Sequence, residues 1–234
     1  MNLLAMDTSG PVAGVSIIKN DQVVYEGMAV NQFTHSVSMM PMVEEALGHA
    51  GMTLDQMDAL AVTVGPGSFT GVRIGVSTVK GMAHGVNKPC IPVDALEAMA
   101  YSAAGFDGVV CPIQDARAGQ VYGAAFKWED GHVHRLMPDT ALKLEEYLVQ
   151  VSKLGERFWF TGDGLNRYKK TICEIMAEKA FIAPAAMSYL RPACAAAAAL
   201  DHQDEAVDYL TLAPLYLRAP QAQRERERRE KQNG

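Results

Sequence analysis

The chain has 234 residues, 49% of them hydrophobic, which is enough to build the core of one large α/β domain or of two small ones. Its formal net charge of -6 argues against a free-standing nucleic-acid-binding protein, because neutralising phosphates requires a concentrated basic surface. Any contact with RNA would therefore be shared with a partner.

Cysteine spacing and the N-terminus indicate the compartment. No CxxC spacing occurs, so neither a zinc site nor a disulfide framework is predicted for Cys90, Cys111, Cys173 and Cys194. The first residues lack the basic start and apolar stretch of a secretion signal, and no run of about 18 apolar residues occurs. We expect a cytoplasmic protein that does not contact a membrane.

Three β patterns precede the first helix. They occupy residues 3–6, 13–18 and 22–26, and residues 7–11 form a polar, glycine-containing turn after the first of them. The chain thus folds back as a hairpin before any helix, which excludes a plain βαβ opening. Apolar residues at helical spacing then predict a helix over residues 36–50.

The rest of the first half alternates strands and helices. A largely apolar run over residues 59–64 predicts a strand buried on both faces, and the glycines after it end that strand. We expect a helix over residues 71–85, a strand over 90–93 and a helix over 95–104.

The second half repeats this order of elements. Its predicted strands cover residues 109–113, 120–127, 132–136 and 157–161, with a short apolar stretch at 181–182, and its predicted helices cover 142–153 and 166–178. Both halves read strand, acidic turn, hairpin, helix, strand, helix. The sequence therefore predicts an α/β protein of two tandem domains, each with a mixed sheet flanked by helices.

We place the N-terminal domain at residues 1–106 and the C-terminal domain at residues 107–220. Residues 221–234 alternate Arg with Glu and contain no apolar residue after Ala222, a composition typical of a frayed helix or of disorder. A fold duplicated in this way resembles the actin-like superfamily of actin, Hsp70 and the sugar kinases (ASKHA, ribonuclease H-like).

The most informative motif lies between the predicted strand 59–64 and the helix after it. Its glycines permit positive φ and close approach of another backbone, and its hydroxyls can cap the helix, whose first amides favour an anion. The motif contains Gly65, Pro66, Gly67, Ser68, Phe69, Thr70, Gly71 and Arg73. It is not a Walker loop, because no Gly-Lys-Ser/Thr follows, and the late third glycine weakens a Rossmann interpretation. Two interpretations of the motif therefore remain: a structural turn or a specialised contact loop.

Together with Asp7, Thr8 and Ser9 at the first turn, this motif resembles the TsaB family, also called YeaZ. Similar motifs occur at residues 115–117, 161–164 and 214–218. The resemblance implies two actin-like domains and a non-catalytic subunit that binds and activates the related subunit TsaD and acts with the ATPase TsaE. Their complex would transfer threonylcarbamoyl from its adenylate to N6 of the adenosine beside the anticodon, in tRNAs that read codons beginning with A. The resemblance also implies a homodimer in isolation and only indirect contact with tRNA.

Compared with the catalytic relatives, the chain differs in its metal-binding residues and in its nucleotide-binding turns, which indicates that it has lost their catalytic activity. The catalytic relatives hold a metal ion through two histidines four residues apart on the first long helix. Here His35 is followed four places later by Met39, and a thioether is a poor ligand for such metals, so we expect no metal site. The competing interpretations are an actin-fold ATPase or kinase and a metallopeptidase-like protein.

The nucleotide-binding turns of the superfamily are only partly kept. The first turn keeps Asp7, Thr8 and Ser9, an acid and hydroxyls that could order a magnesium ion through water. In the second turn, between Asp115 and Arg117, a methyl and a guanidinium replace a glycine pair. We therefore treat these residues as vestigial nucleotide contacts, with at most weak ATP or ADP binding at a subunit interface. Residues 161–164 form either a relic of an adenosine loop or a tight turn.

Two helices are candidates for a partner surface with TsaD or with a second copy of the chain. The residues we assign to it are Met39, Met40, Val43, Leu47, Gly71, Gly75 and Val79. Packing within the domain core is the alternative interpretation for each of them. Arg73, one turn into the second helix, would clamp an acidic group of the partner or a bound anion, or form an exposed salt bridge.

Overall fold

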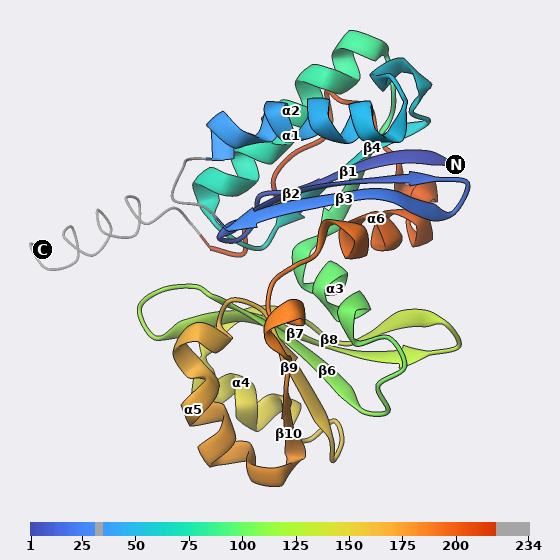
Figure 1. The fold of residues 1–234 in the computed structure, drawn as a ribbon. Helices are drawn as coiled ribbons and strands as arrows, with labels where there is room; N and C mark the ends of the chain where they lie inside the picture. Colours follow the sequence, from blue (N-terminus) through green and yellow to red (C-terminus); the bar gives the residue numbers. More distant parts are fainter. Residues whose placement is uncertain (31–34, 219–234) are drawn as a thin grey trace, which may run out of the picture.

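The computed structural model describes residues 1–30 and 35–218. It contains two five-stranded sheets, with helices between them and on their outer faces (Figure 1). The first sheet has the order β3-β2-β1-β4-β5, where β1 pairs antiparallel with β2 and parallel with β4. Its strands are β1 (Asn2–Asp7), β2 (Val12–Lys19), β3 (Gln22–Val30), β4 (Ala59–Gly65) and β5 (Cys90–Asp94).

The second sheet repeats the first. Its order is β10-β9-β6-β7-β8, and its central strand β6 again pairs antiparallel with the next strand and parallel with β9. Its strands are β6 (Val109–Asp115), β7 (Gln120–Glu129), β8 (His132–Lys143), β9 (Phe158–Thr161) and β10 (Ala180–Ile182). The predicted α/β fold with two mixed sheets is thus confirmed. The helix predicted from residue 142 begins two residues later, because β8 continues to Lys143.

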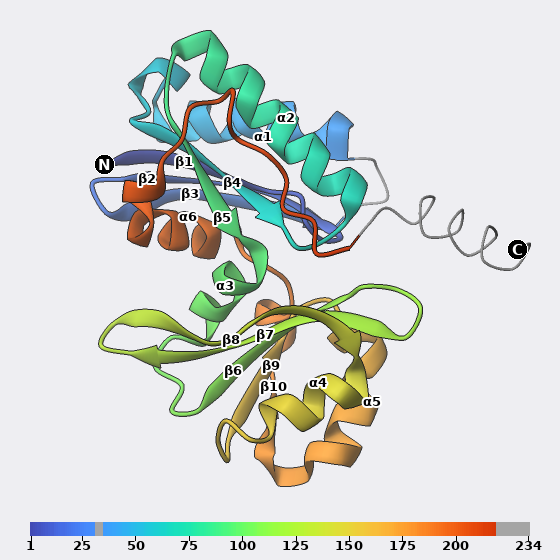
Figure 2. The ribbon, with the colours of Figure 1, turned by 180° about the vertical axis from the view of Figure 1, so that it is seen from behind.

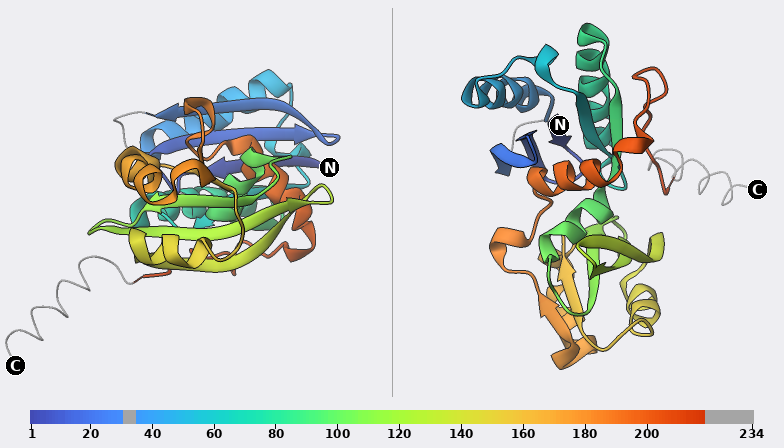
Figure 3. Two further views of the ribbon diagram at one scale, coloured as in Figure 1. Left: turned by 90° about the horizontal axis from the view of Figure 1, so that it is seen from below. Right: turned by 90° about the vertical axis from the view of Figure 1, so that its right-hand side faces the viewer.

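Helices cover both faces of each sheet. The first sheet carries α1 and α2 on its outer face, the second carries α4 and α5 on its own, and α3 and α6 lie between the sheets (Figures 1 and 3). The α-helices are α1 (His35–Ala50), α2 (Phe69–Val86), α3 (Ala95–Ala100), α4 (Leu144–Val151), α5 (Leu165–Met176) and α6 (Pro192–Asp201). Short 3₁₀ turns occur at Leu54–Gln56, Tyr101–Ala103, Ala177–Lys179, Ala185–Met187 and Gln203–Glu205. No helix in the described ranges has the length and apolar content needed to cross a bilayer.

Residues after 189 return to the first sheet, although we predicted that residues 107–220 all belong to the C-terminal domain. The alanine-rich helix α6 packs on Leu3 and Ala5 of β1, because its small side chains permit a close approach. Residues 206–218, which we call the strap, then run along β5 and α2 (Figure 2). The assignment of residues 190–218 to the second domain is therefore corrected. The boundary near residue 106 remains a prediction, and the tail at 221–234 lies outside the described residues.

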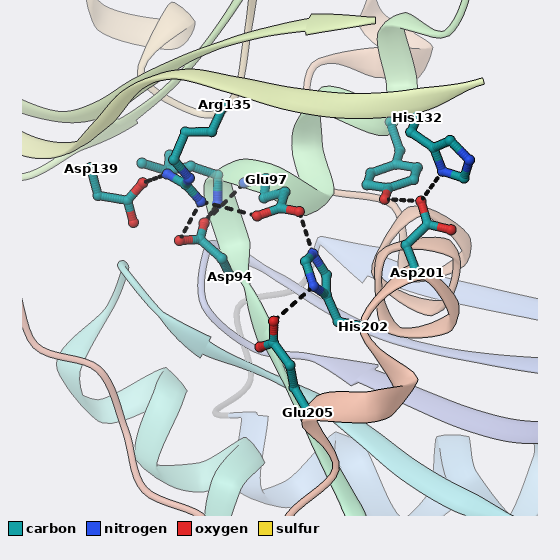
Figure 4. A network of polar contacts seen from close by, with 10 residues as sticks. Asp94, Glu97, His132, Arg135, Asp139, Asp201, His202 and Glu205 are labelled. Carbon is teal, nitrogen blue, oxygen red and sulfur yellow. Dashed lines mark hydrogen bonds and ion pairs between the residues drawn. The ribbon is translucent and has the colours of Figure 1, made fainter. Parts of the chain in front are cut away.

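A network of charged side chains joins the two domains (Figure 4). Arg135 of β8 donates to Asp94 and Glu97 at the start of α3, at 3.1 Å each, and also pairs with Asp139. His202, just after α6, lies 2.6 Å from the second carboxylate oxygen of Glu97. The second sheet is thus held to both helices that cover the inner face of the first.

A second contact of the same kind lies at the end of α6. The carboxylate of Asp201 accepts from the hydroxyl of Tyr101 at 2.6 Å and lies 3.2 Å from Nδ1 of His132 in β8.

Within the network, the pKa of Asp139 is raised to about 8, because its carboxyl is buried and lies beside Asp94, although the charge of Arg135 opposes the rise. Burial and the neighbouring carboxylate of Asp94 thus favour the protonated form of Asp139 at the junction between the domains.

Replacing Asp139 with asparagine should flatten the pH dependence of stability. A carboxyl whose pKa is raised from 3.8 to about 8 takes up a proton on folding. The free energy of unfolding of the wild type should therefore fall as the pH rises through this interval, by up to about 1.4 kcal/mol per pH unit. Urea unfolding across the interval measures the slope. The control Asp107→Asn, at a surface carboxylate, should keep the wild-type slope; a wild-type slope in Asp139→Asn would contradict the assignment.

Candidate functional site

The first turn is built on a buried carboxylate at the end of β1. Oδ1 of Asp7 accepts hydrogen bonds from the amide of Ser9 at 2.9 Å and from the hydroxyl of Thr63 at 2.5 Å. Burial raises the pKa of Asp7 above its ordinary value, although these hydrogen bonds lower it. The side chain is 1% exposed, so Asp7 fixes the backbone of the turn and faces little solvent.

The glycines of the motif make room for that turn. A Cβ on Gly67 would lie 2.3 Å from the carbonyl oxygen of Ser9, and one on Gly71 would lie 2.1 Å from that of Thr8. A Cβ on Gly75 would meet the Thr8 hydroxyl at 2.4 Å. The same hydroxyl donates to the carbonyl of Gly71 at 2.8 Å. The motif is thus the structural turn of the two interpretations, packed against residues 7–10.

The start of α2 confirms one prediction. The side chain of Ser68 caps the helix by accepting from the amide of Gly71 at 3.2 Å, and its own amide donates to Ser9 at 2.7 Å. One residue therefore joins the first turn, the motif and the helix.

The strap is held to the motif by backbone and aromatic contacts. Gly65 has φ +128, and a Cβ there would lie 2.4 Å from the carbonyl oxygen of Leu215. The ring of Tyr216 stacks on Phe69 with centroids 4.5 Å apart, and its hydroxyl accepts from Nε of Arg73 at 2.8 Å. The Arg73 guanidinium also lies 4.0 Å from the centre of the Phe69 ring. In the part of the chain that the structure describes, Arg73 thus holds the strap and makes no salt bridge.

The second turn repeats the geometry of the first. Oδ1 of Asp115 accepts from the amide of Arg117 at 2.9 Å, as Asp7 accepts from Ser9. Three successive residues, Arg117, Ala118 and Gly119, have positive φ. Arg218 of the strap donates to the carbonyl of Ala116 at 3.0 Å, so the strap joins the glycine motif to the second turn.

Polar groups lie beside both turns. Burial raises the pKa of Asp163 to about 6, helped by the charge of Asp115. Nε2 of His35 lies 3.0 Å from the carbonyl of Gly10, and Met39 is buried in the first core. No cluster of three or more metal-ligating side chains occurs in residues 1–30 and 35–218. Weak nucleotide binding stays a prediction.

Several residues assigned to the partner surface lie in the core. Met39, Val43 and Val79 are at most 2% exposed, because they face β1 and β2 and not solvent. Gly71 and Gly75 face the first turn. Their assignment as partner contacts is therefore corrected, whereas Met40 is exposed and Leu47 half-buried.

Other residues of these helices are exposed and were missed from sequence. Val37 of α1 is 64% exposed beside Met40 at 43%. On α2, Ser77, Gly81 and Gly85 share an exposed face at helical spacing, and a Cβ on either glycine would meet no atom within 4 Å. A helical apolar pattern does not say which face is buried, but glycines inside a helix are a usable signal. We call these five residues the α1/α2 face.

Comparisons with known proteins place the chain among tRNA-modification proteins. Residues 29–226 match the family model of TsaD, tRNA N6-adenosine threonylcarbamoyltransferase. The tRNA threonylcarbamoyladenosine biosynthesis protein TsaB of Bacillus subtilis is 34% identical over 95% of this chain and 96% of its own length. TsaB of Escherichia coli is 32% identical over 83% and 86%. A Pseudomonas aeruginosa crystal structure, described as similar to the peptidase YeaZ, superposes with a TM-score of 0.80 at 27% identity, over 93% of this chain and 99% of its own.

Adding one methyl group at the motif should destabilise the chain. Gly71→Ala places a Cβ 2.1 Å from a backbone oxygen that cannot move alone, so we expect a loss of about 1–3 kcal/mol in the free energy of unfolding. Gly81→Ala is the matched control, because open space surrounds it; it should raise stability by up to about 1 kcal/mol. Urea unfolding of both variants measures this. Equal stabilities would show that the motif is not packed as described.

Proposed function

The chain belongs to the TsaB family, and we propose that it acts in tRNA threonylcarbamoyladenosine biosynthesis as a non-catalytic subunit that binds and activates TsaD. In this role it works with TsaE in the cytoplasm. TsaD transfers threonylcarbamoyl from its adenylate to N6 of the adenosine next to the anticodon. This chain supplies a folded surface for that subunit.

One observation carries the non-catalytic part of the proposal. The first turn of an actin-like domain is where phosphates and a metal would be bound, and here the motif packs directly against it. Asp7 is buried by this packing, with a raised pKa and with Thr63 and Ser9 already as donors to it. Its Oδ1 holds the backbone of the turn and, although its Oδ2 has no hydrogen-bond partner among the described residues, the residue is 1% exposed, which supports a subunit that binds no ligand there.

The α1/α2 face supports binding to a related subunit. Glycine inside a helix costs about 1 kcal/mol relative to alanine, and no atom of the described residues requires it at Gly81 or Gly85. A second helix lying close against α2 would make use of the missing side chains. Met40, which belongs to this face, adds an unbranched, adaptable side chain that a partner could contact. TsaD shares the domain that matches residues 29–226, so its equivalent helices are the natural counterpart.

Charged residues on this face should prevent the association. Met40→Glu and Gly81→Glu both change exposed positions, so each variant should fold with a wild-type melting temperature but no longer copurify with TsaD. Leu154→Glu, an exposed apolar position on the second domain, is the control and should copurify normally. Folded variants of Met40 and Gly81 that still bind TsaD at wild-type strength would refute this surface.

Depleting the protein from cells tests the function itself. We expect threonylcarbamoyladenosine to disappear from tRNAs that read codons beginning with A, as measured by mass spectrometry of digested tRNA. Expression of the wild type should restore the nucleoside, whereas Met40→Glu should not. Unchanged levels of the modified nucleoside after depletion would rule the proposal out.

A further inference from the structure

Four arginines gather at one edge of the molecule although they come from four separate segments. Residues 1–218 contain seven arginines in all, so more than half lie here in a chain whose net charge is -6. They are Arg73 of α2, Arg117 of the second turn, Arg167 of α5 and Arg218 of the strap. We call them the arginine edge.

Hydrogen bonds and ion pairs connect these arginines one after another. Arg73 donates to the hydroxyl of Tyr216, two residues before Arg218, and Arg218 donates to the carbonyl beside Arg117. Arg117 and Arg167 both lie 3.8 Å from the carboxylate of Asp115. The edge therefore runs from α2 of the first domain, along the strap, to the second turn and α5 of the second domain.

Three of the four arginines are more exposed than the acids beside them. Arg73 is exposed, and the side chains of Arg117 and Arg167 are 83% and 55% exposed, whereas that of Asp115, placed between them, is 16% exposed. Even with Asp115 and Asp163 both ionised, the four guanidinium groups leave an excess of positive charge at this edge. A chain of net negative charge does not need such a cluster for solubility.

The chemistry of the edge resembles surfaces that bind a nucleic-acid backbone. Guanidinium groups match phosphate oxygens in geometry and are held here by a rigid scaffold. Tyr216, stacked on Phe69, is 41% exposed beside Arg73, and aromatic rings interleaved with arginines can accept an unpaired base. Residues 219–234, which continue the chain from this edge, carry five basic and three acidic side chains. An acidic protein partner would require no exposed ring.

We propose that the arginine edge contacts the phosphate backbone of the substrate tRNA while the chain is bound to its catalytic partner. This rests on the proposed function, and it departs from the expectation that tRNA is reached only through TsaD. The edge adds contacts to those of the partner; its four charges are too few for the acidic chain to bind tRNA alone.

The double variant Arg117→Ala/Arg167→Ala tests this in the complex with TsaD. Fluorescence anisotropy with labelled tRNA needs no catalysis. Each lost phosphate contact should weaken affinity roughly fivefold, which corresponds to about 1 kcal/mol. It should also make the slope of log affinity against log salt less negative by about 0.7 per arginine on a single strand.

Lys169→Ala is the matched control. Lys169 is exposed on the same helix as Arg167 but about 200° round its axis, so tRNA affinity and the salt slope should stay at wild-type values. Wild-type affinity and slope in the double variant would overturn the proposal. So would loss of TsaD binding by the double variant, because the edge would then belong to the protein interface. A wild-type complex that binds tRNA through these arginines but makes no modified nucleoside would instead count against the proposed function alone.

Discussion

The close packing of the glycine motif against the first turn is the constraint on which the rest of this structure depends. Carbonyl oxygens of Thr8 and Ser9 occupy the space that side chains at residues 71 and 67 would fill. That contact sets where α2 begins, and Gly65 lets the strap pass beside it. The first turn, the motif and the strap are thus packed as one unit at this end of the first sheet.

Local patterns predicted the duplicated fold well. Alternating and helical apolar spacing, with turns of glycine, asparagine and aspartate, identified every strand within a few residues, except that β8 runs on to Lys143. Helix α6 and the strap were not found, because an alanine run and an irregular segment carry no local signal of the sheet that they cover. The buried and exposed faces of α1 and of α2 could not be distinguished from the sequence either, because apolar residues lie on both. Met39 and Met40 look alike in sequence, and only packing on β2 decides that the first is buried.

The duplication also explains how the candidate sites relate to one another. Both central strands end in an aspartate that accepts from the amide two residues later. The strap contacts the end of β4 through Leu215 and the second turn through Arg218. The ion pairs that Arg135 makes with Asp94 and that His202 makes with Glu97 hold the two domains together at the start of α3. The α1/α2 face and the arginine edge that we propose as contact surfaces thus lie on two domains that these ion pairs join.

Reconstitution from purified components tests the central claim most directly. The chain, TsaD, or both would be combined with TsaE, ATP, threonylcarbamoyl-adenylate and unmodified tRNA, and the modified nucleoside measured by mass spectrometry. The account predicts multiple-turnover modification only when the chain and TsaD are both present, and none with the chain alone. Modification of tRNA by this chain without TsaD, or full activity of TsaD without this chain, would contradict it.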